Sequence, residues 1–256
     1  MINNTLFTGK FLIHEPEMLS TNDFGKNLIS KTNPIDGTVI ITDAQTKGKG
    51  QGNNSWVTKA GKNLTFSIIY NTNFLRANQQ FYISMAVANG VFNAMQKLAP
   101  NEQLNIKWPN DIICNNYKIG GILIENTIMG QYLKNSIIGI GINVNQTNFE
   151  GLPFANSLYN ILQKENAIKD VLELICQCVE HEYLNLKKGY FKSTISSYNN
   201  SLYRKGEMIT FQVDEKEKIA QLTEVNEFGQ LGLASLNQVK FYNHGQINWL
   251  WHNEVI

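Results

Sequence analysis

Three segments of the chain carry apolar residues at the spacing of an amphipathic α-helix. In residues 79–98 most apolar side chains fall on one face of a 3.6-residue period, and Pro100 then ends the pattern. Residues 170–188 show the same periodicity. A shorter segment, 191–198, is expected to continue the same layer. The pattern therefore predicts two long helices that pack on a core and a third, shorter one.

Short apolar and β-branched runs, separated by polar turns, predict strands in the first 145 residues. The predicted strands are 38–42, 64–70, 104–108, 119–125 and 137–145. Asn115-Asn116, between two of them, is typical of a hairpin turn. We therefore expect an α+β fold with a mixed, largely antiparallel sheet and helices on one face. No GxGxxG opens a helix and GxxxxGK[ST] is absent, which disfavours a doubly wound nucleotide fold.

After residue 203 the chain changes to short segments in which apolar and polar residues alternate, and turn residues separate these segments. This texture is typical of a small antiparallel sheet or barrel. We therefore expect two domains, a larger one over residues 1–203 and a small β domain over 204–256.

Polar residues at four places could carry chemistry, and the first is Ser20-Thr21-Asn22. Ser20 stands three residues before Asp23, which is typical of a helix N-terminus and predicts a helix to about Lys31. The hydroxyl, amide and backbone groups there could bind a neutral polar ring, although a plain helix cap is the simpler interpretation.

The second place is a glycine-rich segment, residues 43–56, between two predicted strands. Its alternate glycines Gly48, Gly50 and Gly52 allow close approach to a ligand, and Lys47 and Lys49 stand beside them. Lysines and backbone N–H groups suit a phosphate or a carboxylate, and the indole of Trp56 suits a flat ring. The segment is thus a candidate nucleotide-binding loop, with an ordinary solvated turn as the alternative.

The third and fourth places lie at strand ends. Lys107-Trp108-Pro109-Asn110-Asp111 is followed by Lys118-Ile119-Gly120-Gly121, which leaves room for a ligand or for a close backbone approach. In residues 139–145 alternation sends Ile140, Ile142 and Val144 to one face of a strand. The opposite face then carries Gly139, Gly141, Asn143 and Asn145. A strand surfaced with glycines that ends in asparagines fits a flat ring lying on a sheet.

Composition narrows the function classes. The 256-residue chain has 43% hydrophobic residues and a formal net charge of +1, so no global basic field attracts nucleic acid or an anionic membrane. We expect no signal peptide and no membrane span. Three cysteines without CxxC suggest reduced thiols in a cytoplasmic protein. The histidines lie outside the four places and lack ligand spacing, so we expect neither a zinc site nor histidine acid–base catalysis. They are His14, His181, His244 and His252.

Together the four places resemble biotin protein ligases of the single-function form, in order over residues 18–250. The specific part is Lys107-Trp-Pro-Asn-Asp111 with Lys118-Ile-Gly-Gly-Ile-Leu-Ile-Glu125 seven residues later. Gly141-Ile-Asn143 and the glycine-rich loop fall where that family has them. The resemblance implies a catalytic α+β domain, related to class II synthetases and lipoate ligases, and an SH3-like β-barrel. It also implies that biotin and MgATP give biotinyl-5′-AMP, from which biotin passes to a lysine of a biotin carrier domain of a carboxylase.

The resemblance also implies roles for single residues. Residues expected to bind biotin are Ser20, Thr21, Asn22, Gln45, Lys49, Gly50, Gln51, Lys118 and Gly120. Residues expected to bind ATP or the adenylate are Gly48, Lys49, Gly50, Trp56, Asn110, Asp111, Lys118 and Asn143. Lys118, Asp111 and Lys49 are the expected catalytic residues, with magnesium arriving on ATP and no metal site evident from spacing. Asn110 and Asp111 would orient ATP, magnesium or the incoming lysine.

The loop departs from the family pattern. Lys49 stands where arginine is usual and Gln51 where many members have a second one, and lysine cannot grip two oxygens in a fixed fork. A lipoate or octanoate ligase, or a nucleotide-binding regulator without catalysis, stays an alternative. We expect no operator-binding domain and no repressor function, because the first motif begins near residue 18. A monomer and a homodimer are both compatible with the sequence.

Overall fold

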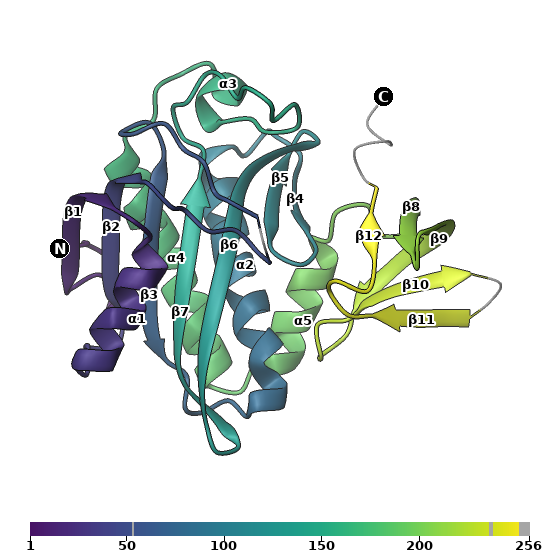
Figure 1. Cartoon of the computed structure of the whole chain (residues 1–256), viewed down its shortest axis with the longest axis horizontal. Helices are drawn as coiled ribbons and strands as arrows, with labels where there is room; N and C mark the ends of the chain where they lie inside the picture. Colours follow the sequence, from purple (N-terminus) through teal and green to yellow (C-terminus); the bar gives the residue numbers. More distant parts are fainter. Residues whose placement is uncertain (53, 236–237, 251–256) are drawn as a thin grey trace.

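The computed structural model describes residues 1–52, 54–235 and 238–250, and its larger part is built on a seven-stranded mixed sheet (Figure 1). At one edge β1 (Leu12–Met18) lies parallel to β2 (Thr38–Gln45). The order continues through β3 (Leu64–Asn71), β7 (Tyr132–Ile142), β6 (Tyr117–Met129), β5 (Asp111–Cys114) and β4 (Leu104–Lys107). These further pairs are all antiparallel, so a mixed, largely antiparallel sheet is confirmed.

The helices lie on both faces of this sheet, whereas we expected them on one. The longer helices α2 (Gln80–Leu98) and α4 (Ile168–Lys187), with α5 (Phe191–Asn200), cover one face. Helix α1 (Thr21–Lys31) packs on β2, β3 and β7 from the other face. The prediction was wrong here because amphipathic spacing shows that a helix has an apolar side but not which face of a sheet receives it. Two short elements, η1 (Ala77–Gln79) and α3 (Leu158–Leu162), complete this part.

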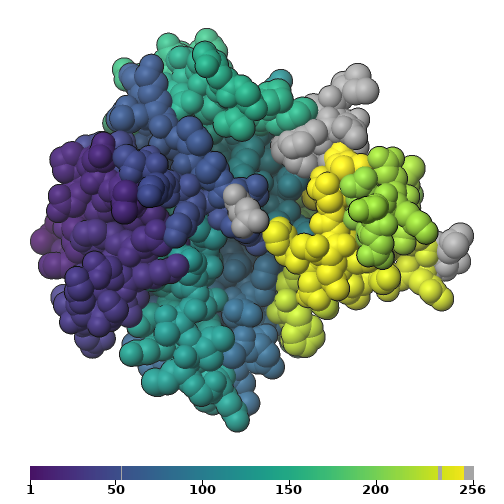
Figure 2. Space-filling model, in the orientation of Figure 1, coloured from purple at the N-terminus to yellow at the C-terminus, as the bar shows by residue number. Residues whose placement is uncertain are grey.

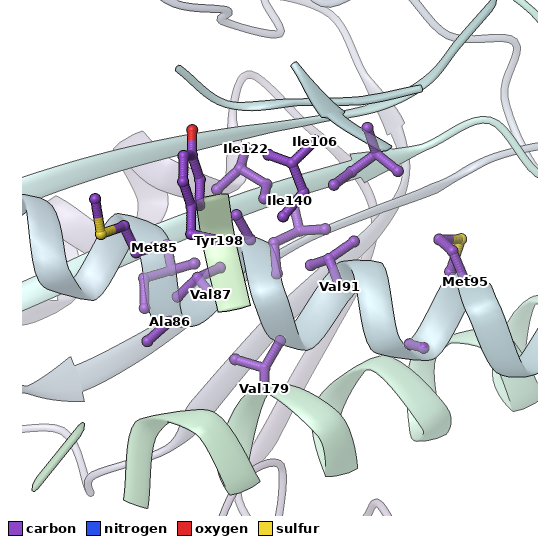
Figure 3. Close-up of a cluster of buried hydrophobic side chains, with 14 of the residues drawn as sticks. Met85, Ala86, Val87, Val91, Met95, Ile106, Ile122, Ile140, Val179 and Tyr198 are labelled. Carbon is purple, nitrogen blue, oxygen red and sulfur yellow. The ribbon is translucent and has the colours of Figure 1, made fainter. Parts of the chain in front are cut away.

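Period-2 alternation along the central strands supplies both faces of the sheet with apolar side chains. In β7, Ile138 and Ile140 join the large core under α2, whereas Ile137 joins the small cluster under α1. Figure 3 shows Val91 and neighbouring side chains of α2 lying between the strands and Val179 of α4. At Gly90 a Cβ atom would lie 2.6 Å from the Cα of Val179, which shows how closely α2 and α4 approach.

The C-terminal strands form a second sheet that is antiparallel throughout. Its order is β11 (Gln238–Tyr242), β10 (Leu231–Ser235), β9 (Lys216–Val225), β8 (Met208–Val213) and β12 (Asn248–Trp249). The expected barrel is corrected to an open sheet, because no ladder joins β11 to β12 within the described residues. Alternation predicts strands, but closure depends on the register of the outermost pair.

The second sheet is docked firmly on the first part of the chain. The indole Nε1 of Trp108 donates to the carbonyl of Gly229 at 2.9 Å, and Asn199 exchanges two hydrogen bonds with Val225. Buried side chains of both sheets belong to one continuous apolar core. Residues of the C-terminal sheet are therefore held at fixed places beside the Lys107–Asp111 segment.

Most predicted elements are confirmed, and two strands were missed. The helices at 21–31, 80–98, 168–187 and 191–200 and the strands at 38–45 and 64–71 match the expectations. β1 and the four-residue β5 were not predicted. The three cysteines are buried and free. Within the described part of the chain, no helix is both long and apolar enough to cross a membrane.

Candidate active site

A cavity of about 770 Å³ opens on the face of the large sheet that carries α1, and the C-terminal sheet borders it. Figure 2 shows the surface hollowed between the main body and the C-terminal strands in yellow. The cavity brings all four predicted places together. Predicted residues that line it are Ser20, Thr21, Asn22, Gln45, Lys49, Gly50, Gln51, Trp56, Asn110, Asp111, Lys118 and Asn143.

One end of the cavity is a buried network of neutral hydrogen-bonding groups at the start of α1. Ser20 caps the helix, since its Oγ accepts from the N–H of Asp23 at 3.4 Å. The Gln45 Oε1 accepts from the backbone N–H of Thr21 at 2.8 Å. The hydroxyl of Ser67 lies 2.7 Å from both Thr21 Oγ1 and Asn22 Oδ1. These amide and hydroxyl groups are fixed in place and suit a neutral polar ligand.

Glycines form the floor beside this polar end. A Cβ atom at Gly139 would lie 2.5 Å from Asn22 Oδ1, and one at Gly141 would lie 2.4 Å from Cε2 of Trp56. Gly121 also faces the indole, because a Cβ atom added there would lie 3.3 Å from Cζ3 of Trp56. The predicted alternation of residues 139–142 is thus confirmed, with glycines on the cavity side and isoleucines on the core side.

Two predicted glycines do not line the cavity. Gly120 faces the core, where an added Cβ would lie 2.6 Å from Cδ1 of Ile142, so Gly121 is the one of the pair that contributes to the floor. Gly48 lies against the carbonyl of Trp56 and accepts that residue's N–H at 3.0 Å. The role of Gly48 in the structure is to fold the loop back on itself.

The indole of Trp56 lies over Gly141. Its Nε1 is buried and has no hydrogen-bond partner among the described residues. A buried donor without an acceptor costs free energy, about 1–3 kcal/mol. The flat group that lies on the glycine surface in the structure is therefore the protein's own indole, and the ligand ring that the sequence suggested there stays a prediction.

The other end of the cavity is charged. The Lys118 Nζ lies 2.7 Å from Asp111 Oδ1, and the Lys107 Nζ lies 3.9 Å from Asp111 Oδ2. Burial lowers the pKa of Lys107 and the Lys118 cation lowers it further, while Asp111 opposes both effects. Two cations share one carboxylate here, so the end of the cavity can accept an anionic ligand.

The remaining predicted residues hold the cavity walls or its rim. The Nδ2 of Asn110 donates to the carbonyl of Ile122 at 2.5 Å, and the Nδ2 of Asn143 donates to that of Asn156 at 3.0 Å. Lys49 does not reach into the charged end, because its Nζ pairs with the Asp23 carboxylate at 2.7 Å. This hydrogen bond with Asp23 raises the pKa of Lys49.

Sequence reasoning missed three residues of the site. Lys107 belongs to the specific motif but received no role, although the motif itself was the signal. His244 and Trp249 come from the C-terminal sheet, and no pattern linked that sheet to the site. The expectation that every histidine lies away from the four places was wrong for His244, whose ring centroid is 5.7 Å from that of Trp108.

The model of the biotin/lipoate A/B protein ligase family matches residues 16–143. The bifunctional ligase/repressor BirA of Bacillus subtilis (strain 168) is 33% identical over 180 residues, which cover 68% of this chain and 54% of that protein. The biotin–[acetyl-CoA-carboxylase] ligase of Mycobacterium tuberculosis is 29% identical over 129 residues, 50% of this chain and 47% of that protein. The chain spans about half the length of the curated relatives it matches.

Solved structures resemble the chain over almost all of its length. The biotin protein ligase of Aquifex aeolicus in complex with biotin and ATP superposes with a TM-score of 0.78 at 25% identity. The alignment covers 94% of this chain and 98% of that one. The resemblance therefore includes both the large sheet and the C-terminal sheet.

Proposed function

The chain belongs to the biotin/lipoate A/B protein ligase family, and from that premise we propose that it is a biotin protein ligase. In the proposed reaction a carboxylate oxygen of biotin attacks the α-phosphorus of ATP, and pyrophosphate leaves. The ε-amine of a carrier lysine then attacks the carbonyl carbon of biotinyl-5′-AMP and loses a proton, and AMP leaves. The acceptor would be a biotin carrier domain of a carboxylase.

The observation that carries the proposal is one cavity with a neutral polar end, a flat glycine floor and a cationic end. Thr21, Asn22 and Gln45 at the polar end offer donors and acceptors suited to a ureido ring. A fatty acyl chain would instead require an apolar tunnel, which makes a lipoate or octanoate ligase the weaker candidate.

The charged end supports adenylate chemistry. A carboxylate approaching a phosphate is opposed by like charge, so fixed cations at the meeting point lower the barrier. We assign this task to Lys118, which Asp111 holds at 2.7 Å, with Lys107 behind it. Lys49 would join them if its pair with Asp23 opened. Residue Trp56 would have to move aside for a ring to lie on Gly141.

Magnesium is assigned to the nucleotide. Within the described residues no three His, Cys, Asp or Glu side chains gather as a metal site, and the Asp111 carboxylate already faces two lysines. The ion would neutralise phosphate charge when it is bound with ATP. We further propose that residues 1–203 and 204–256 act as two domains that share the one cavity.

The direct test is transfer of labelled biotin to a carrier domain in the presence of ATP. We expect labelling that unlabelled lipoate does not compete away. Lys118→Ala should reduce pyrophosphate release from biotin and ATP about 10²–10³-fold, the usual cost of removing one group that stabilises developing charge. His14→Gln is a control, because His14 lies on β1 outside the cavity. Labelling by lipoate in place of biotin, or unchanged release in Lys118→Ala, would contradict the proposal.

A further inference from the structure

The C-terminal sheet places one titratable side chain at the rim of the cationic end. His244 lies in the turn between β11 and β12, lines the cavity and is exposed to solvent. Its ring packs against the Trp108 indole at a centroid distance of 5.7 Å, and Trp108 is itself fixed by its hydrogen bond to Gly229. The ring is therefore positioned by the docked sheet but stays accessible to a ligand in the cavity.

The surroundings of His244 favour the neutral imidazole while the cavity holds no anion. Although the side chain reaches solvent, the groups packed around the ring desolvate it in part, and this effect and the nearby Lys107 cation lower the pKa of His244, while the Asp111 carboxylate opposes them. Lys118, the third charged group at this end, is paired with Asp111. The turn itself, residues 243–246, carries no other charged side chain. An anion that enters beside Lys107 shifts His244 toward its protonated form, because a nearby negative charge favours the imidazolium cation.

The geometry also separates His244 from the reacting carboxylate. Asn22 lies in α1 and contacts the glycine floor at Gly139. Lys107 and Trp108 instead contact the C-terminal sheet, through the ring of Trp249 and the carbonyl of Gly229. Of biotin and ATP, the two substrates of the first proposed step, only ATP carries a chain of anionic groups long enough to extend away from the point of attack. Its β- and γ-phosphates are the groups that fit a basic rim there.

We propose that His244 binds the terminal phosphates of ATP and takes up a proton as they arrive. This inference rests on the proposed function. It makes His244 a substrate-binding residue supplied by the C-terminal sheet. It also couples nucleotide binding to pH, because the proton is gained on binding and returns to solvent when pyrophosphate leaves.

Calorimetry with inorganic pyrophosphate tests the proposal on the full chain. Binding is measured at pH 7.5 in buffers of different ionisation enthalpy, so that the slope of the observed enthalpy gives the protons taken up. We expect uptake by the unmodified protein and by His14→Gln, whose imidazole lies outside the cavity. We expect no uptake by His244→Gln. His244→Lys should bind without uptake, because a permanent cation replaces the titrating one.

Kinetics supply the second readout. His244→Gln should raise KM for ATP about tenfold at pH 6.5 and much less at pH 8.5, and transfer from preformed biotinyl-5′-AMP should not change. Three results overturn the proposal: no binding of pyrophosphate, binding without proton uptake in the unmodified protein, or the same uptake in His244→Gln. The proposed function fails separately, if pyrophosphate binds with uptake but no biotinyl adenylate forms.

Discussion

The glycine floor allows a sharp test, because neighbouring glycines face opposite sides of one sheet. In Gly141→Ala the new methyl group would lie 2.4 Å from Trp56 Cε2 and 2.7 Å from its Nε1. Ordinary carbon contacts are about 3.5–4.0 Å, so any flat group on this surface must rise by roughly 1 Å. We expect the indole to move aside, because it belongs to an exposed loop, and the fold to persist.

The proposed biotin-binding residue Asn22 contacts Gly139 on the same glycine floor, so the expected loss is one of biotin binding. A displacement of about 1 Å at a site that positions a reacting group costs on the order of 10²-fold, or about 2.7 kcal/mol in kcat/KM for biotin. Gly121→Ala is a milder substitution, since its methyl group would lie 3.3 Å from the Trp56 ring. We expect it to lower kcat/KM for biotin by less than about tenfold. The assay is pyrophosphate release at limiting biotin concentration.

Gly120→Ala is the matched control on the opposite face. Its methyl group would lie 2.6 Å from Ile142 Cδ1 and 3.1 Å from the carbonyl of Gly141, inside the core. Overpacking of this kind lowers the free energy of unfolding by about 1–3 kcal/mol and should leave kcat/KM for biotin nearly unchanged. If Gly141→Ala is folded and retains full kcat/KM, the glycine surface is not the place where biotin binds, and the reasoning is refuted.

Two further predictions concern charged side chains. Lys49→Ala should raise the rate at which biotinyl-5′-AMP escapes about tenfold in a trapping experiment, because a cation is lost from the loop. Asp23→Asn should slow the escape, because it frees Lys49 from its ion pair. An unchanged rate in both variants would rule out a role for Lys49. The Glu180 carboxylate accepts the backbone N–H groups of Leu6, Phe7 and Thr8 at 2.5, 2.9 and 2.7 Å. Burial raises the pKa of Glu180, but these donors outweigh it and hold the pKa below its ordinary value of 4.5. The stabilisation from the ionised carboxylate is therefore present above pH 4.5 and is lost as pH falls through the lowered pKa. Glu180→Gln should lower the free energy of unfolding in urea by about 2–4 kcal/mol at pH 7 and by progressively less below pH 4.5. A difference in unfolding free energy between the two proteins that does not depend on pH would contradict this.

The sequence predicted those parts of the site whose geometry follows from local spacing. Ser20 caps α1 because a hydroxyl at that position reaches the N–H of Asp23. Gly139 and Gly141 share a face because side chains alternate along a strand. The same rule would have excluded Gly120, since it pairs with Ile142 and faces the core.

The parts that could not be predicted depend on long-range packing. β1 combines Pro16 with two glutamates and a histidine, and such a strand is stable only at a sheet edge beside a partner that the sequence does not identify. The contribution of His244 depends on where the C-terminal sheet docks, which the Trp108 indole and the shared core decide. The periodicity of apolar residues along the chain does not predict this contact between the two sheets.

The aromatic lining of the cavity also determines how the protein can be observed. The chain has four tryptophans, and the three that the structure describes, Trp56, Trp108 and Trp249, all line the cavity from three separate segments. Trp108 and Trp249 also belong to the continuous apolar core, to which α2 and α4 contribute mainly tyrosine, methionine, cysteine and aliphatic side chains. Emission from these three tryptophans therefore reports on the cavity that they line. An unfolding curve followed by the emission of these residues reports on the loss of the cavity, and circular dichroism reports on the melting of the helices, of which α2 and α4 are the longest.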